Sequence, residues 1–288
     1  MTNTEQTVSL PKQATEGIMK AGKERTNMPV GKMILLGIMA GIFIAMGAAA
    51  SSMVSHGVDN GSIAKLMSGI VFPVGLMMIV LAGGELFTGD CMMIIGVLDR
   101  KYTLLSMIKV LLVVYAANFA GALLTAFLVS QSGQLDYTEG LLGAYTIKIA
   151  VSKISMSFGT SFVSGILCNI LVCAAVLMSS AAKEISGKVL TIFFPIMVFV
   201  VSGYEHCVAN MYFIPAGIFA SDNSAYVEKA IELYGYTADK IGELSWQSFL
   251  VNNIFPVTLG NMAGGIIFVG LPLYLIHCKK SNEKRHMA

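Results

Sequence analysis

The chain has 288 residues, of which 55% are hydrophobic and 12% are charged. Soluble domains are about 25% charged, so this composition excludes an ordinary soluble domain. The mean hydropathy of +0.72 indicates a polytopic membrane protein whose apolar surface is buried against lipid and neighbouring helices. The net charge of +2 says nothing about nucleic acid, for which no partner is expected, and the distribution of charge along the chain is more informative.

Six apolar stretches are long enough to cross a bilayer, which takes about 20 residues in a helix. Residues 1–31 are polar and precede the first of these stretches, so we expect no cleavable signal peptide. The sequence therefore predicts an all-α membrane protein. The predicted spans are 32–55, 62–98 with a break near 84–91, 103–130, 156–181, 188–218 with a break near 203–208, and 248–277.

The second and fifth stretches are too long for one straight crossing, and each breaks at small residues before an acid. The first break lies at Gly84-Glu85 and the second at Gly203-Tyr204-Glu205. A charge at bilayer depth costs about 2.5–3.5 kcal/mol on insertion scales, so such acids are rare and usually functional. We expect each stretch to form two half-helices joined by an irregular turn, an arrangement typical of transport sites.

The two breaks belong to a wider internal repeat, whose matches fall in the same order in both halves of the chain. Each copy contains three spans, an odd number, so the second copy must enter the membrane from the opposite side. The sequence predicts inverted repeats, about 32–130 and 156–277, with the site near mid-depth. The matched positions are Ala40-Gly41 with Ser164-Gly165, Phe72-Pro73 with Phe194-Pro195, and Asn118-Phe119-Ala120-Gly121 with Asn261-Met262-Ala263-Gly264.

Most Lys and Arg residues between the spans fall on one side of the membrane in this arrangement. The positive-inside rule places that side, and both termini, in the cytoplasm. The sequence then divides into a cytoplasmic segment (1–31), a six-helix transmembrane domain (32–278) and a cytoplasmic tail (279–288), with 221–247 as an outer loop. The basic residues predicted on the outer side are Lys65, Lys148, Lys153, Lys229 and Lys240.

His206 is the leading candidate for a functional residue because it alone among the four histidines lies at mid-membrane. Burial favours a neutral imidazole, whereas an arriving anion or Glu205 would favour the protonated form. Thr88 could bond His206 or a passing solute, and Asn169 could bond across helices. Lys153, at the outer interface, could concentrate anions or extend to the headgroups. Glu205 and Glu85 could face the pore or lock the breaks.

Two other classes of protein are alternatives to an anion channel. A channel for a neutral solute such as water or glycerol could use the same fold, although His206 and Lys153 argue against it. A membrane enzyme or receptor is disfavoured because the sequence has no metal-ligand spacing, nucleophile triad, phosphate loop or soluble domain. The five cysteines form no CxxC pair and are expected to be buried packing residues, so no cofactor or metal is predicted.

These motifs resemble the formate/nitrite transporter family over nearly the whole chain. The resemblance rests on FPVGL followed by GGELFTG, on Lys153 with GILCNILVC, and on FPIMVFV followed by SGYEHCVANM. It implies an aquaporin-like protomer with broken second and fifth spans, assembled as a homopentamer, in which each protomer has its own pore. It also implies a multi-pass protein of a prokaryotic inner membrane that transports small monovalent anions and is not an enzyme.

The resemblance also implies roles for individual residues. His206 is expected as the central pore histidine with Thr88 as its loop partner, Asn169 as the pore asparagine, Lys153 as the vestibule lysine, and Glu205 as the acid beside the histidine. Formate is the favoured substrate, with proton transfer at the histidine as one route, while hydrosulfide and nitrite remain open and lactate is a further family substrate. The expected constriction residues are Phe72, Leu76, Leu86, Phe87 and Phe199.

The stretch from Ala14 to Lys23 is predicted to form a short amphipathic helix at the cytoplasmic mouth. An anchor on the membrane surface is favoured for it over a gate.

Overall fold

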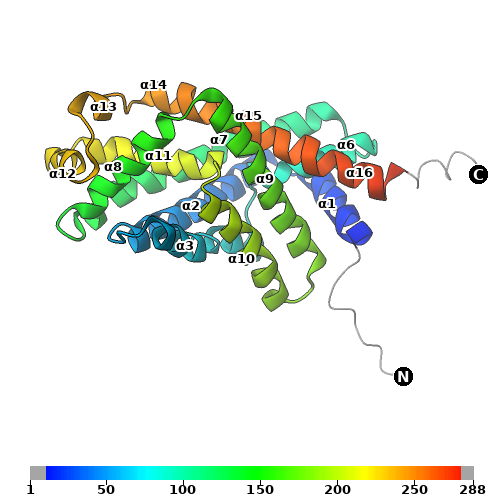
Figure 1. The fold of residues 1–288 in the computed structure, drawn as a ribbon. Coiled ribbons are helices and arrows are strands. Elements are labelled where there is room, and N and C mark those ends of the chain that lie inside the picture. The colour runs from blue at the N-terminus through cyan, green and yellow to red at the C-terminus, as the bar shows by residue number, and fades with distance from the viewer. Residues whose placement is uncertain (1–10, 280–288) are drawn as a thin grey trace, which may run out of the picture.

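The computed structural model describes residues 11–279, and every regular element in that range is a helix. Residues 1–10 of the expected N-terminal segment and 280–288 of the expected tail lie outside the described residues. The helices form one elongated bundle (Figure 1), with α1 (Pro11–Thr26) and α16 (Leu271–His277) at one end and α12 (Ser224–Tyr234) and α13 (Ala238–Gly242) at the other.

Six helical stretches in the described range are long and apolar enough to span a membrane, as the sequence predicts. Their bounds lie within a few residues of the expected ones. The spans are α2 (Val30–Ser55), α3 with α4 (Gly61–Val71 and Val74–Ala82), α7 (Leu104–Gln131), α9 (Phe158–Ala181), α10 (Ile185–Ser202) and a final stretch over Trp246–His277. The final stretch consists of α14 (Trp246–Ser248), η3 (Phe249–Ile254), α15 (Phe255–Ala263), η4 (Gly264–Gly270) and α16, of which η3 and η4 are π-helical.

Both predicted breaks are present, and each begins at a glycine. Helix α4 ends at Gly83, with φ of +95°, and α10 ends at Gly203, with φ of +72°. A residue with a side chain rarely adopts this backbone conformation, so glycine sets where each first half-helix stops. The second half-helices are α11 (Cys207–Ser221) in the fifth span and, in the second, α5 (Phe87–Asp90), η1 (Cys91–Met93) and α6 (Ile94–Leu98).

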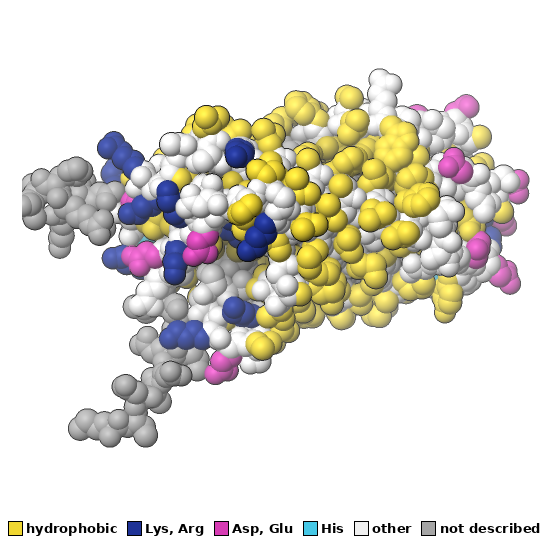
Figure 2. Space-filling view, turned by 180° about the vertical axis from the view of Figure 1, so that it is seen from behind, with side chains coloured by type: hydrophobic (Ala, Val, Ile, Leu, Met, Phe, Trp, Pro, Cys, Tyr) yellow, Lys and Arg dark blue, Asp and Glu magenta, His cyan; other side chains and the backbone are white. Residues whose placement is uncertain are grey.

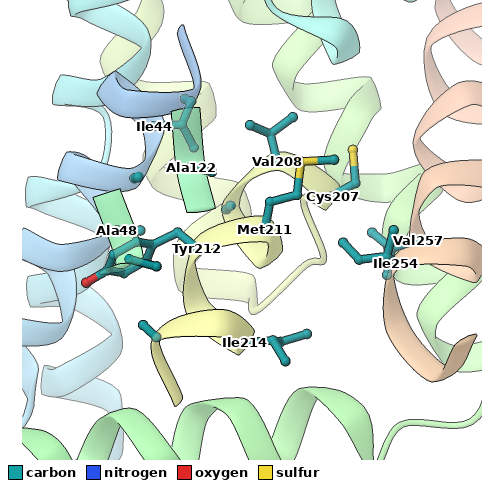
Figure 3. Close-up of a cluster of buried hydrophobic side chains, with 14 of the residues drawn as sticks. Ile44, Ala48, Ala122, Cys207, Val208, Met211, Tyr212, Ile214, Ile254 and Val257 are labelled. Atoms are coloured by element: carbon teal, nitrogen blue, oxygen red, sulfur yellow. The ribbon is translucent and has the colours of Figure 1, made fainter. Parts of the chain in front are cut away.

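The half-helix α11 lies in the centre of the bundle. Its side chains pack against α2 and α7 on one side and against the final span on the other. Figure 3 shows this arrangement, with Met211 and Val208 between Ile44 of α2 and Val257 of α15. A half-helix enclosed in this way exchanges lipid contact for protein contact, which allows its irregular start to lie at membrane depth.

Not every helix has a counterpart among the sequence predictions. Helix α8 (Leu141–Ile154) precedes the fourth span and packs against α11 and α12. It stands to the second repeat as α1 stands to the first, because each is a helix directly before the opening span of its half. Each also carries a basic residue in its last turn, Lys153 in α8 and Arg25 in α1. The expected outer loop, 221–247, contains α12 and α13.

Helix α1 confirms the predicted amphipathic helix, but its apolar face lies on protein. Ile18 and Met19 are buried in a cluster with Met92, Ile95 and Cys173. The expectation of an anchor on the membrane surface is therefore wrong, because the residues that would insert into lipid are covered by α6, η1 and α9. Too little apolar surface of α1 remains exposed for the helix to insert into a bilayer.

The surface shows an apolar belt between two polar ends (Figure 2). On the face shown, Lys and Arg gather at the end that carries α1, with some Asp and Glu among them, while Asp and Glu are the main charged residues at the opposite end. Exposed apolar side chains of the spans include Leu105, Leu112, Phe194 and Phe268. A belt of this kind is expected where a protein contacts hydrocarbon or neighbouring subunits.

Candidate functional site

Each break is fixed by one asparagine from the third span of its own repeat. In the first break, the Asn118 side-chain oxygen accepts a hydrogen bond from the Phe87 backbone N–H at 3.0 Å. Its amide nitrogen donates to the carbonyl of Glu85 at 2.9 Å and to that of Gly37 at 2.8 Å. These bonds satisfy backbone groups that a broken helix leaves without a partner.

Asn261 makes the same set of bonds in the second break. Its oxygen accepts from the Cys207 N–H at 2.9 Å, and its nitrogen donates to the carbonyls of Glu205 at 3.0 Å and Gly165 at 2.8 Å. Sequence analysis found Asn118 and Asn261 as a repeated pair but assigned them no role. The repeat could have indicated this role, because a buried asparagine side chain at the same place in both halves needs equivalent hydrogen-bond partners in each.

His206 is buried, with 3% of its surface exposed, and it caps the N-terminus of α11. Its Nδ1 accepts a hydrogen bond from the Ala209 N–H at 3.1 Å, while Nε2 lies 3.1 Å from Thr88 Oγ1. Because Nδ1 accepts a bond, the neutral ring carries its proton on Nε2, directed at Thr88. The two halves of the protein therefore meet at this contact.

Asn169 lies behind that contact and supports it. Its Nδ2 donates to the carbonyl of Thr88 at 3.1 Å and to the carbonyl of Asn261 at 2.6 Å. Both of its side-chain N–H groups are thus used on backbone carbonyls, one in each half. In this structure the expected pore asparagine ties the first break to the second and holds Thr88 in place.

Lys153 and Glu205 form a buried ion pair beside His206. The Lys153 Nζ lies 2.7 Å from Glu205 Oε1, and the other carboxylate oxygen accepts from Asn210 at 2.6 Å and from Asn253 at 3.3 Å. Within residues 11–279, every bond to the carboxylate comes from a side chain, so the carboxylate does not bind backbone N–H groups of the break. Glu205 is fully occupied by these contacts, so its charge holds Lys153 at the site.

A cavity of about 500 Å³ opens above the histidine on the side of α8. Of the predicted site residues, five line it, namely Phe72, Lys153, Phe199, Glu205 and His206. The Phe72 and Phe199 rings meet edge to face with 5.5 Å between centroids, and the Phe199 ring stacks near the His206 ring at 5.9 Å. The two phenylalanines therefore place apolar rings directly beside His206, and their expected role as constriction residues stays a prediction.

The remaining predicted residues lie away from this cavity. Thr88 reaches His206 as described, and Asn169 bonds to backbone. Leu76, Leu86 and Phe87 are buried, and the Phe87 ring packs edge to face on Tyr115 of α7 at 4.8 Å. Their expected role as constriction residues stays a prediction.

Two basic residues of the cavity were assigned only to the outer side by sequence analysis. Lys65 and Lys148 line it together with Lys153. The Lys148 Nζ lies 4.4 Å from the centre of the Tyr234 ring, and neither Lys65 nor Lys148 forms an ion pair within residues 11–279. Their shared predicted side of the membrane was the only sequence signal, since helix α8, which brings Lys148 inward, was not predicted.

A matching ion pair lies in the first break, where Arg25 of α1 binds Glu85 and also lies 3.1 Å from Asp90 Oδ1. Burial alone would lower the pKa of Arg25, but the neighbouring carboxylates of Asp90 and Glu85 raise it well above its ordinary value. Arg25 therefore stays charged at any physiological pH. It stands to Glu85 as Lys153 stands to Glu205.

Six spans in two inverted halves, with half-helices that meet at a buried histidine, define the protomer of a membrane channel. The family model for the formate/nitrite transporter matches residues 12–275. The chain therefore belongs to the formate/nitrite transporter family. The expected fold class is confirmed, and the relatives are transporters and channels rather than enzymes.

Similar proteins include the "Probable formate transporter" of Methanothermobacter thermautotrophicus, which is 37% identical over 88% of this chain and 91% of its own length. The "Formate channel FocA" of Haemophilus influenzae is 36% identical over 91% of this chain and 92% of its own. A solved structure described as "Pentameric formate channel with formate bound" superposes with a TM-score of 0.76. It is 33% identical and covers 86% of this chain and 97% of its own.

Proposed function

We propose that the protein conducts a small monovalent anion across the membrane and that formate is its preferred substrate. The observation that carries the proposal is the His206 Nε2 at 3.1 Å from Thr88, at the base of a cavity that bears three lysines. The names of the relatives support formate, while hydrosulfide and nitrite remain the alternatives. We further propose a homopentamer, by analogy with the solved pentameric channel.

The basic end of the molecule supports a cytoplasmic location for α1, and we propose that both termini lie on that side of a prokaryotic inner membrane. The cavity then opens to the outside. Lys65, Lys148 and Lys153 raise the local concentration of anions there, although Lys153 is already paired with Glu205. Lys65 and Lys148, which form no ion pair in the described range, therefore also contribute the positive charge that attracts anions.

An anion that passes Phe72 and Phe199 loses water, which is costly unless new hydrogen bonds replace the lost ones. The Nε2–H of His206 is placed to provide one. A neutral imidazole that gave this proton away would become an anion. Proton transfer to the substrate therefore needs a second proton at Nδ1, at the expense of the bond from Ala209. We propose that hydrogen bonding comes first and that proton transfer follows only when the anion stabilises the imidazolium.

Uptake of labelled formate into proteoliposomes tests the proposal, with nitrite, hydrosulfide, lactate and chloride as competitors at two pH values. We expect saturable formate flux that excess formate competes best. Stronger competition by hydrosulfide or nitrite would support the same anion pathway but make that competitor the preferred substrate. Osmotic swelling with glycerol but no formate flux would instead establish the neutral-solute channel.

Replacement of the histidine tests its role in proton transfer. In His206→Ala we expect formate flux to depend less on pH than in wild type, because the imidazole beside Thr88 is gone. The measurement is initial uptake across a pH series with purified variant of normal oligomeric state. A pH dependence equal to that of the wild type would rule out proton transfer at this residue.

A further inference from the structure

The two breaks match in their asparagine locks and in their acid–base pairs, but they differ at one polar position. Five residues after the acid of the break, the second half has Asn210 and the first half has Asp90. In the second break, Asn210 donates to Glu205, so one carboxylate is surrounded by one lysine and two amides. The charges of that site add to zero.

The first break instead has two carboxylates and one cation. The Arg25 Nε pairs with Glu85 and with Asp90 Oδ1. The other oxygen, Asp90 Oδ2, is buried and accepts no hydrogen bond from any residue in 11–279. No other basic residue of that range lies within ion-pair distance of either acid. With both acids ionised, a net negative charge would be buried without a partner.

The remaining titratable groups around Asp90 do not supply a cation. The Tyr102 hydroxyl donates to the carbonyl of Met93 at 2.8 Å, and the nearby thiols of Cys91 and Cys173 are buried. The carboxyl groups of Glu85 and Asp90 contact the same atom, Arg25 Nε, and therefore lie close to one another. Two carboxyl groups that share a site cannot both ionise readily, since each charge disfavours the other.

We propose that Glu85 and Asp90 share one proton and form, with Arg25, a proton-binding site in the first break. The site is built from α1 and the start of the second half-helix. Its open side is Arg25, whose side chain is 24% exposed while that of Asp90 is 2% exposed. Protons therefore exchange with the basic end of the molecule, where α1 lies.

This site gives the pathway a sidedness that the second break lacks. With the proton bound, one positive and one negative charge remain and the site is neutral. As pH on the α1 side rises, the proton is lost and a negative charge appears next to Thr88, which lies between the two acids in the chain and contacts His206. Anions are then repelled, so flux from the α1 side falls. This consequence for flux rests on the proposed function, but the proton site does not.

Infrared spectroscopy tests the site without any transport assay. A protonated carboxyl group has a C=O stretch well separated from those of carboxylates, and we expect wild-type protein to show it at neutral pH. Asp90→Asn and Glu85→Gln should each lose the band, because one acid beside Arg25 stays ionised. Asp222→Asn, the same chemical change at an exposed acid, should retain it. A wild-type spectrum without the band, or one unchanged in both variants, would refute the proposal.

The flux consequence is measured in vesicles of sorted orientation, with pH varied on one face at a time. We expect wild-type formate flux to fall as pH on the α1 face rises, and Asp90→Asn to lack that response while it keeps the response to the other face. Asn is the residue at the matching place in the second break, and Glu85→Gln gives a second test if Asp90→Asn fails to assemble. An unchanged response in the variants overturns the sidedness. Absence of formate flux in wild type, with the infrared band present, counts against the proposed function alone.

Discussion

At the scale of single residues, the site consists mostly of polar groups that bind one another. Glu205 holds Lys153, Asn169 holds Thr88, and the Ala209 N–H fixes the tautomer of His206. The Nε2–H of the histidine is directed at Thr88, and three lysines line the cavity above it. Most of these residues therefore act on transport through the position of His206.

Replacement of Lys153 by methionine should mainly lower the stability of the protein and affect the attraction of anions less. The change leaves Glu205 buried with its amide partners but without a cation, and loss of one partner of a buried pair costs about 3–5 kcal/mol. We expect a lower melting temperature in detergent and partial recovery in the double variant Lys153→Met with Glu205→Gln. Lys148→Met is the matched control, which should reduce flux at low substrate and leave the melting temperature near that of wild type.

Equal melting temperatures for Lys153→Met and Lys148→Met would contradict this account, because they would show that the pair with Glu205 contributes nothing to stability.

At the scale of helices, each repeat contains a close crossing between its first and third spans. A Cβ on Gly121 of α7 would lie 2.1 Å from the carbonyl oxygen of Ile38 in α2, and one on Gly260 of α15 would lie 2.1 Å from that of Phe162 in α9. Small residues permit such approach between membrane helices, where packing rather than the hydrophobic effect drives association. The crossings bring Asn118 and Asn261 within reach of the breaks.

Alanine at Gly121 should therefore separate α2 from α7 and weaken the first lock. Because the obstructing atom belongs to backbone, relief requires a shift of a whole helix. We expect a fall in melting temperature and in formate flux. Gly31→Ala in α2 meets no atom within 4 Å, and it should be neutral or stabilise by up to about 1 kcal/mol through helix propensity. A Gly121→Ala protein as stable as Gly31→Ala would be inconsistent with the close crossing.

At the scale of the whole molecule, much of the fold could be predicted because its signals are local or repeated. Long apolar stretches predicted the spans, and the glycines before Glu85 and Glu205 predicted the breaks. Helix α8 could not be predicted in the same way. Its mixture of polar and apolar residues gives neither a long apolar stretch nor a repeated motif by which it could be recognised. The position of Lys148 in the cavity depends on that helix and could not be predicted either.

Apart from the expected contact of Thr88 with His206, the partners of the polar residues could not be predicted from the sequence. His206 and Thr88 are 118 positions apart, and only packing of the two halves brings them to 3.1 Å. Arg25 gave no signal, because a basic residue in a polar N-terminal segment is ordinarily solvated. The inverted repeat could have indicated it, since α1 and α8 precede equivalent spans and Arg25 and Lys153 occupy their last turns.

The asparagine locks have a consequence for biosynthesis. Within residues 11–279, the Asn118 side chain bonds to Gly37, Glu85 and Phe87, and the Asn261 side chain bonds to Gly165, Glu205 and Cys207, so each lock is confined to one half of the chain. The first break can close as soon as its third span enters the bilayer, while the second half is still being translated. The first half can thus close its break early, while the Thr88 carbonyl gains its partner Asn169 only when the second half is in place.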